Sequence, residues 1–210
     1  MATFSEKSTV QDFLADRISD NGFTEVKAKD LPRQLADPYI PAYLKQAVID
    51  LNPTLKAHPE RYDEIEPRLS AIFGKAVTSS PMQANKEFIQ QLFGGFTHKF
   101  IGDNDYTTIH LFDLDNPENN QAIVSKEVVY KTPNTHERFD LVLFLNGLPV
   151  VIIETKNITQ DWKLGVSDIN QVYLNKAPAF FATNILNVVC NGTNFRYGSL
   201  NQPDYTWSMW

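Results

Sequence analysis

The chain has 210 residues, of which 42% are hydrophobic and 21% charged, so it can form one large domain or two small ones. Its single cysteine, Cys190, excludes an intrachain disulfide and any metal site built from several cysteines. No apolar run reaches the roughly 18 residues of a membrane span, and the first residues lack the apolar core of a signal peptide. We therefore expect a cytoplasmic protein without membrane contact. The net charge of −6 argues against a protein coated in nucleic acid, but it leaves open a domain to which a larger assembly delivers DNA.

The first half of the chain has the spacing of apolar residues that is typical of amphipathic helices. Helices are expected over residues 9–18, 42–51, 61–77 and 82–93, and Pro67 should bend or divide the third of them. Gly22, Pro53 and the pair Gly94-Gly95 provide stop signals after three of these segments.

The second half of the chain predicts mainly strands, with one helix. Strands are expected over residues 96–100, 106–112, 122–130, 138–145, 149–155, 180–182 and 187–191, and a helix over residues 165–174. The layout predicts an α/β fold with a central mixed β-sheet flanked by helices and an N-terminal helical layer. Residues 1–95 would be a mainly helical part of the same domain, and residues 96–210 its mixed-sheet core.

The segment VVIIETK, residues 150–156, raises the question of function. Four apolar residues are typical of a strand that is buried on both faces, yet Glu154 and Lys156 follow directly. Asp140 lies near the start of the preceding strand, residues 138–145, and Asn146-Gly147 between the two strands is a strong hairpin signal. A hairpin would bring Asp140 and Glu154 to the same end of the sheet.

The turn decides whether the two acids share a face. A two-residue turn would pair Leu145 with Leu148 and place Asp140 opposite Ile153, with Glu154 on the other face. A three-residue turn over residues 145–147, with Gly147 in the left-handed conformation, would place both acids and Lys156 on one face. If the acids act together, we expect the three-residue turn. A two-residue turn without a bulge elsewhere would count against a joint site.

Two carboxylates and a lysine at one strand end form a metal site with hydrolytic potential. A few oxygen ligands suit Mg²⁺, with Mn²⁺ as a possible substitute, and the bound ion would lower the pKa of a water molecule. Lys156 could orient that water, stabilise negative charge, or act as a base if its pKa is depressed. A structural interpretation remains open: Asp140 could form an ordinary ion pair with Arg138 or Lys156, and Glu154 and Lys156 could be the solvated end of a strand.

The surrounding sequence resembles a known family over much of the chain. The similar segments are NKEF (85–88), GGF (94–96), LFDLDNPENN (111–120), RFDLVLFLNGLPVVIIETKN (138–157) and RYGS (196–199). Together they resemble the N-terminal nuclease domain of the R subunit of bacterial type I restriction enzymes, which belongs to the PD-(D/E)xK nuclease superfamily. The resemblance is most specific from residue 85 to residue 200.

The resemblance implies an enzyme that hydrolyses phosphodiester bonds in double-stranded DNA with Mg²⁺. Asp140 and Glu154 would hold the ion with the main-chain carbonyl of Thr155, and Lys156 would position the attacking water. In the family, the R subunit carries an ATP-driven motor after this domain and works with methylation and specificity subunits. The 210 residues contain no phosphate-binding loop, so we expect ATP to be bound by that motor region and not by this chain.

The sequence departs from the family pattern at two points. Phe139 stands where the superfamily name has proline, and Ile169 stands four residues before Tyr173, where the family has glutamine. The nearest glutamine is Gln171, which either substitutes or is unrelated. We expect Tyr173, Gln171 and Arg138 on the DNA side of the site. An N-terminal acid sometimes joins such sites, and the candidates are Glu6, Asp12 and Glu87.

Two other interpretations remain open. The chain could be a standalone repair nuclease of the same superfamily, but the similar segments outside the acids argue against that. It could also be a non-catalytic docking or relay module of a restriction complex. Such a module would not need Asp140, Glu154 and Lys156 together, so their presence favours the nuclease.

Overall fold

The computed structural model describes residues 6–92 and 94–210, with side chains from residue 10 onward. Within these residues a seven-stranded mixed sheet has the order β1-β4-β5-β6-β7-β8-β9. Its strands are β1 (Thr24–Glu25), β4 (Ala122–Thr132), β5 (Thr135–Leu145), β6 (Leu148–Thr155), β7 (Leu186–Cys190), β8 (Phe195–Gly198) and β9 (Ser208–Met209). The β1–β4 and β6–β7 pairs are parallel and the others antiparallel. The predicted α/β fold with a central mixed sheet is confirmed.

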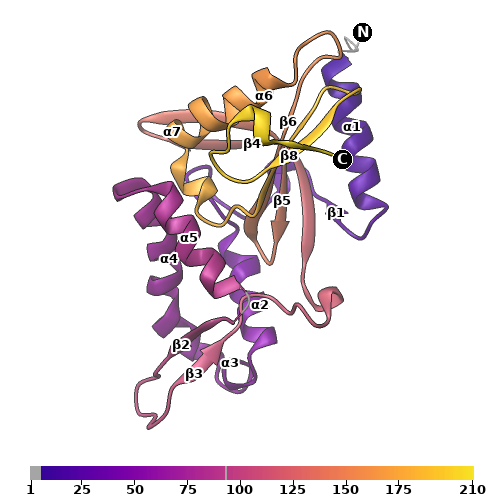
Figure 1. The fold of residues 1–210 in the computed structure, drawn as a ribbon. Helices are drawn as coiled ribbons and strands as arrows, with labels where there is room; N and C mark the ends of the chain where they lie inside the picture. Colours follow the sequence, from indigo (N-terminus) through magenta and orange to yellow (C-terminus); the bar gives the residue numbers. More distant parts are fainter. Residues whose placement is uncertain (1–5, 93) are drawn as a thin grey trace.

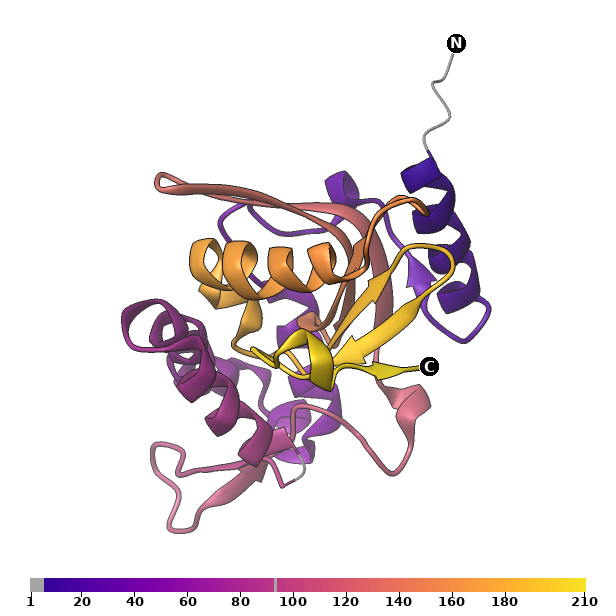
Figure 2. The ribbon, with the colours of Figure 1, turned by 45° about the horizontal axis from the view of Figure 1, so that its top comes forward.

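Helices cover both faces of this sheet. Helix α1 (Glu6–Ser19) packs against β4, β5 and β6 through buried Leu14 and Ala15. On the other side, α6 (Lys163–Ser167) continues into a π-helix, η4 (Asp168–Tyr173), and then into α7 (Leu174–Lys176). Figure 2 shows this continuous helix lying alongside the long β4–β5 hairpin.

The remaining helices form a group beside the sheet, below it in Figure 1. They are α2 (Pro41–Leu51), α3 (Pro53–Ala57), α4 (Tyr62–Thr78) and α5 (Pro81–Leu92), and they are accompanied by a separate hairpin of β2 (Phe96–His98) and β3 (Thr107–Ile109). Helix α4 is not divided at Pro67, because Ile65, Leu69 and Phe73 form a continuous buried stripe that holds it against its neighbours. Among the described residues no helix is long and apolar enough to cross a membrane.

The strand predicted over residues 180–182 is wrong. Residues Pro178–Phe181 form a 3-10 helix, η5, in which Phe180 and Phe181 are both fully buried. Pro178 fixes the backbone at the start of this turn and has no N–H to donate to a strand neighbour. Phe180 packs on Phe139 and Tyr130, so the apolar run fills the space between helix and sheet.

The turn between β5 and β6 also differs from the prediction. It has two residues: Leu145 pairs with Leu148, and Asn146 and Gly147 both have positive φ, 51° and 79°. The register then shifts, because Phe144 pairs with Pro149 whereas Leu143 pairs with Val151. Val150 is therefore an extra residue in β6, which is a β-bulge. The three-residue turn is wrong, and the bulge provides the one-residue shift instead.

The bulge brings the acids together. Beyond it, Leu141 pairs with Ile153, and the next residues along the two strands are Asp140 and Glu154. Pro149 explains the position of the bulge, because proline cannot donate a ladder hydrogen bond and is tolerated in sheets at such irregularities. The β-bulge thus provides the register that a joint site requires, although the turn has only two residues.

Candidate active site

Asp140 and Glu154 lie in adjacent strands, and each is only 1% exposed. Two buried carboxylates are costly unless hydrogen bonds or opposite charges stabilise them. Asp140 Oδ2 accepts hydrogen bonds from the main-chain N–H of Thr155, at 2.9 Å, and from its hydroxyl, at 2.7 Å. The Thr155 hydroxyl in turn accepts a bond of 3.2 Å from Nε2 of Gln11, a buried residue of α1. Helix α1 is thereby connected to Asp140.

Glu154 is held from the face of the sheet that α6 and the π-helix cover. Its Oε2 accepts a hydrogen bond of 2.9 Å from the hydroxyl of Tyr173, whose ring packs edge-on against Phe139 at 4.9 Å. Burial, together with the charge of Glu154, raises the pKa of Tyr173 well above its usual value. The phenol therefore stays protonated and acts as a donor to Glu154.

Lys156 lies between two carboxylates. Its Nζ donates to Glu154 Oε1 at 2.6 Å and also to Asp168 Oδ2 in the π-helix. Burial by itself would lower the pKa of Lys156, but the hydrogen bonds to Asp168 and Glu154 outweigh burial and raise it. This arrangement favours the ammonium form, which donates hydrogen bonds, over a neutral lysine acting as a base.

These contacts test the two structural alternatives, an ordinary ion pair of Asp140 with Arg138 and a solvated strand end at Glu154 and Lys156. Arg138 does not pair with Asp140; its guanidinium contacts Glu127 at 3.0 Å. Glu154 and Lys156 do form an ion pair, but their side chains are 2% and 12% exposed, so they are not a solvated strand end. The three predicted residues are brought together at one buried position.

Other residues named from the sequence lie farther from the acids. The side chain of Gln171 is exposed, and among the described residues it makes no hydrogen bond to the site. Asp12 pairs with Lys126 at 2.7 Å, and Glu87 pairs with Lys75. The side chain of Glu6 lies outside the described residues. Arg138 contributes its main-chain carbonyl, which accepts a second contact of 3.3 Å from the Tyr173 hydroxyl.

The donor atoms fit a hard divalent cation. Asp140 and Glu154 offer carboxylate oxygens, and Mg²⁺ is commonly held by one or two protein carboxylates while water and substrate phosphate complete its shell. Within the described part of the chain, no group of three or more His, Cys, Asp or Glu side chains is arranged to hold a metal ion.

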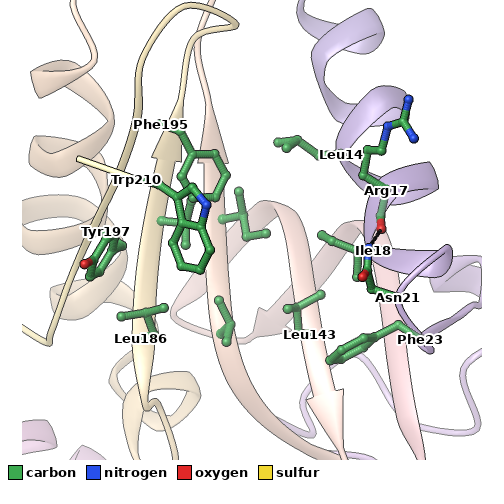
Figure 3. A pocket seen from close by; sticks show the side chains of 13 residues that line it. Leu14, Arg17, Ile18, Asn21, Phe23, Leu143, Leu186, Phe195, Tyr197 and Trp210 are labelled. Carbon is green, nitrogen blue, oxygen red and sulfur yellow. Dashed lines mark hydrogen bonds between the residues drawn. The ribbon is translucent and has the colours of Figure 1, made fainter. Parts of the chain in front are cut away.

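An apolar cavity of about 450 Å³ lies on the other face of the sheet, between α1 and the strands (Figure 3). Leu14 and Ile18 line it from the helix, and Ile153 and Trp210 line it from the sheet side. Ile153 precedes Glu154 directly, and neighbouring strand residues point to opposite faces. The cavity is therefore separate from the acids.

Two residues of the site were not predicted from the sequence. Asp168 carried a weak signal, since it lies five residues before Tyr173, but the family pattern directed attention to the residue four before it. Gln11 gave no signal, because a glutamine on a predicted surface helix is ordinary. Both become evident only when α1 and the π-helix are packed on the sheet.

Comparison with known proteins agrees with the resemblance found in the sequence. A search of curated proteins found no relative that matches. The family model described as "Type I restriction enzyme R protein N terminus" matches residues 3–206, which is nearly the whole chain. The chain therefore belongs to the family of type I restriction enzyme R protein N-terminal domains.

Proposed function

We propose that this chain is the metal-dependent endonuclease domain of a type I restriction enzyme R subunit. Its reaction would be hydrolysis of phosphodiester bonds in double-stranded DNA, with Mg²⁺ as the cofactor and Mn²⁺ able to replace it. The observation that carries the proposal is the buried cluster of Asp140, Glu154 and Lys156 at the end of the β5–β6 hairpin. A structural role alone would not require two carboxylates at 1% exposure.

The roles of the residues follow from their contacts. Asp140 and Glu154 would hold the cation together with the Thr155 carbonyl; when bound, it would lower the pKa of a water molecule and neutralise charge on the phosphate. Thr155 orients Asp140 and Tyr173 orients Glu154 through the hydrogen bonds described above. The Lys156 ammonium would orient the attacking water and stabilise the developing negative charge. Arg138 and Gln171, at the surface, would contact DNA.

The partners of the domain belong to the same proposal. The domain would act in the cytoplasm within a complex that also contains methylation and specificity subunits. A motor region of the same subunit would use ATP to translocate DNA to the site. The acidic net charge is compatible with this arrangement, because the motor and not this domain would supply most of the DNA affinity.

Calorimetric titration of Mg²⁺ and Mn²⁺ into this chain tests the site directly. Asp140→Ala and Glu154→Ala should each abolish binding, whereas Glu118→Ala, at an exposed acid in the 3-10 helix Pro117–Asn119, should not. Unchanged binding in the first two variants would contradict the metal site.

Cleavage by the assembled restriction complex tests the reaction. Lys156→Ala should slow cleavage by about 10²–10³-fold, the usual cost of losing one group that stabilises charge in the transition state. ATP hydrolysis by the complex should be unchanged. Cleavage at the normal rate would favour a docking role for the domain.

A further inference from the structure

Asp168 is the acidic partner of Lys156 that the sequence motif does not include. The Lys156 ammonium contacts Glu154 Oε1 on one side and Asp168 Oδ2 on the other. The three side chains differ in exposure: 2% for Glu154, 12% for Lys156 and 38% for Asp168. Lys156 therefore links a fully buried carboxylate to one at the edge of the site.

The π-helix explains how Asp168 reaches this position. In an α-helix, residues five apart point to different sides, because a turn contains 3.6 residues. In a π-helix, the backbone hydrogen bond joins residues five apart. Asp168 and Tyr173 are the first and last residues of η4, and their side chains reach Lys156 and Glu154 respectively. Ile169, four residues before Tyr173, is instead fully buried in the core.

We propose that Asp168 is a positioning residue, which shares the Lys156 ammonium with Glu154 and holds it at the edge of the site when Glu154 binds a cation. This inference rests on the proposed function. Lys156 and a divalent cation would compete for the same carboxylate oxygen of Glu154. Asp168 offers the ammonium a second anionic partner, so that Lys156 can release Glu154 without losing its compensating charge. The site then keeps a charged donor beside the cation.

Two other roles for Asp168 would give different results. A pair with a residue that is 38% exposed could be an ordinary surface salt bridge, which contributes little. Alternatively, Asp168 could itself be a ligand of the cation. The three possibilities differ in whether Asp168 affects the affinity for the cation and in whether that effect depends on Lys156. A double-mutant cycle therefore distinguishes them.

The experiment is calorimetric titration of Mn²⁺ into the chain and into Asp168→Asn, Lys156→Ala and the double variant. Asp168→Asn should weaken Mn²⁺ binding by about tenfold, because Lys156 is then left on Glu154. Lys156→Ala should not weaken binding, since it removes the competitor. In the Lys156→Ala background, Asp168→Asn should change the affinity less than about twofold. Asp168→Glu, which keeps the carboxylate, should retain most of the parent affinity.

Asp204 provides a matched control. Its side chain is 36% exposed and pairs with Lys163 at 3.3 Å, so it resembles Asp168 in charge, exposure and type of partner. Asp204→Asn should leave Mn²⁺ binding unchanged. An equal loss of affinity on Asp168→Asn with and without Lys156 would overturn the inference in favour of a metal ligand. Parent affinity in Asp168→Asn would overturn it in favour of a surface salt bridge.

A second measurement separates failure of the inference from failure of the proposed function. If the parent chain binds no Mn²⁺ even with a short DNA duplex present, the proposed metal site is contradicted. The same four proteins then give the coupling between residues 156 and 168 in the free energy of unfolding. Measurable coupling would keep Asp168 as the residue that positions Lys156, and its absence would overturn that role too.

Discussion

Each carboxylate of the site is oriented by a donor from a different layer of the molecule. Thr155 holds Asp140 and is itself held by Gln11 of α1, whereas Tyr173 of the π-helix holds Glu154. A buried carboxylate loses its hydration, and hydrogen bonds from the protein offset that loss. The donors therefore hold both carboxylates at fixed positions.

The Thr155 hydroxyl provides a residue-scale prediction. Thr155→Val keeps the shape of the side chain but removes its hydroxyl from Asp140 and from the buried Gln11 amide. We expect the free energy of unfolding to fall by about 1–3 kcal/mol and Mn²⁺ affinity to fall with it. Chemical denaturation and calorimetry measure the two effects.

Thr183→Val is the control for this prediction. Thr183 is also fully buried, and its hydroxyl donates to the carbonyl of Pro149 at 2.9 Å. Its loss should lower stability similarly and leave metal affinity unchanged. If both variants bind Mn²⁺ like the parent, Thr155 does not orient Asp140.

At the scale of the element, the β5–β6 hairpin sets the position of the acids. Asn146 is fully buried, and its side-chain amide donates to the carbonyl of Leu111 at 2.8 Å and to Asn120 Oδ1 at 2.9 Å. The carbonyl of Gly147 accepts a bond of 2.8 Å from the N–H of Ile40, directly before α2. The turn is therefore fixed by residues from two other segments.

Gly147→Ala should destabilise the protein. Gly147 has a φ of 79°, and a Cβ there would lie 2.6 Å from the carbonyl oxygen of Ile40. Strain and overlap together should lower the free energy of unfolding by about 2 kcal/mol or more, measured by denaturant titration. Gly102 has a similar φ of 88° but open space around it. Gly102→Ala should therefore show the strain alone, and an equal effect of both substitutions would contradict the close packing at Gly147.

At the scale of the whole molecule, the negative net charge limits how strongly the domain alone can bind DNA. The chain has 19 Lys and Arg against 25 Asp and Glu. Near the site, Arg138 and Lys176 are paired with Glu127 and Glu137. A surface of this kind would neutralise few phosphates, which agrees with the proposal that another part of a complex holds the DNA.

The isolated chain should bind duplex DNA weakly. We expect a Kd of about 10⁻⁴–10⁻⁶ M at physiological salt, with a salt dependence equivalent to about one or two phosphate contacts. Fluorescence anisotropy over a series of salt concentrations measures both. Arg138→Ala should reduce the slope of the logarithm of the binding constant against the logarithm of the salt concentration by about one. Arg17→Ala, on α1, should leave this slope unchanged. A slope equivalent to five or more contacts would contradict this view of the surface.

The sequence by itself determined the class of fold and the residues of the cluster. Apolar periodicity located most helices and strands. The charges that follow a buried strand identified Glu154 and Lys156, and the hairpin signal brought Asp140 to the same end of the sheet. These signals are local, since they depend on residues within one element or one hairpin. The tertiary structure decided the rest. A bulge at Val150 set the register of the acids, and a π-helix turned Asp168 toward Lys156. Residues 149–153 are apolar on both faces, so their periodicity carries no information about a one-residue shift of register. The apolar spacing over residues 165–174 likewise does not distinguish a π-helix from an α-helix.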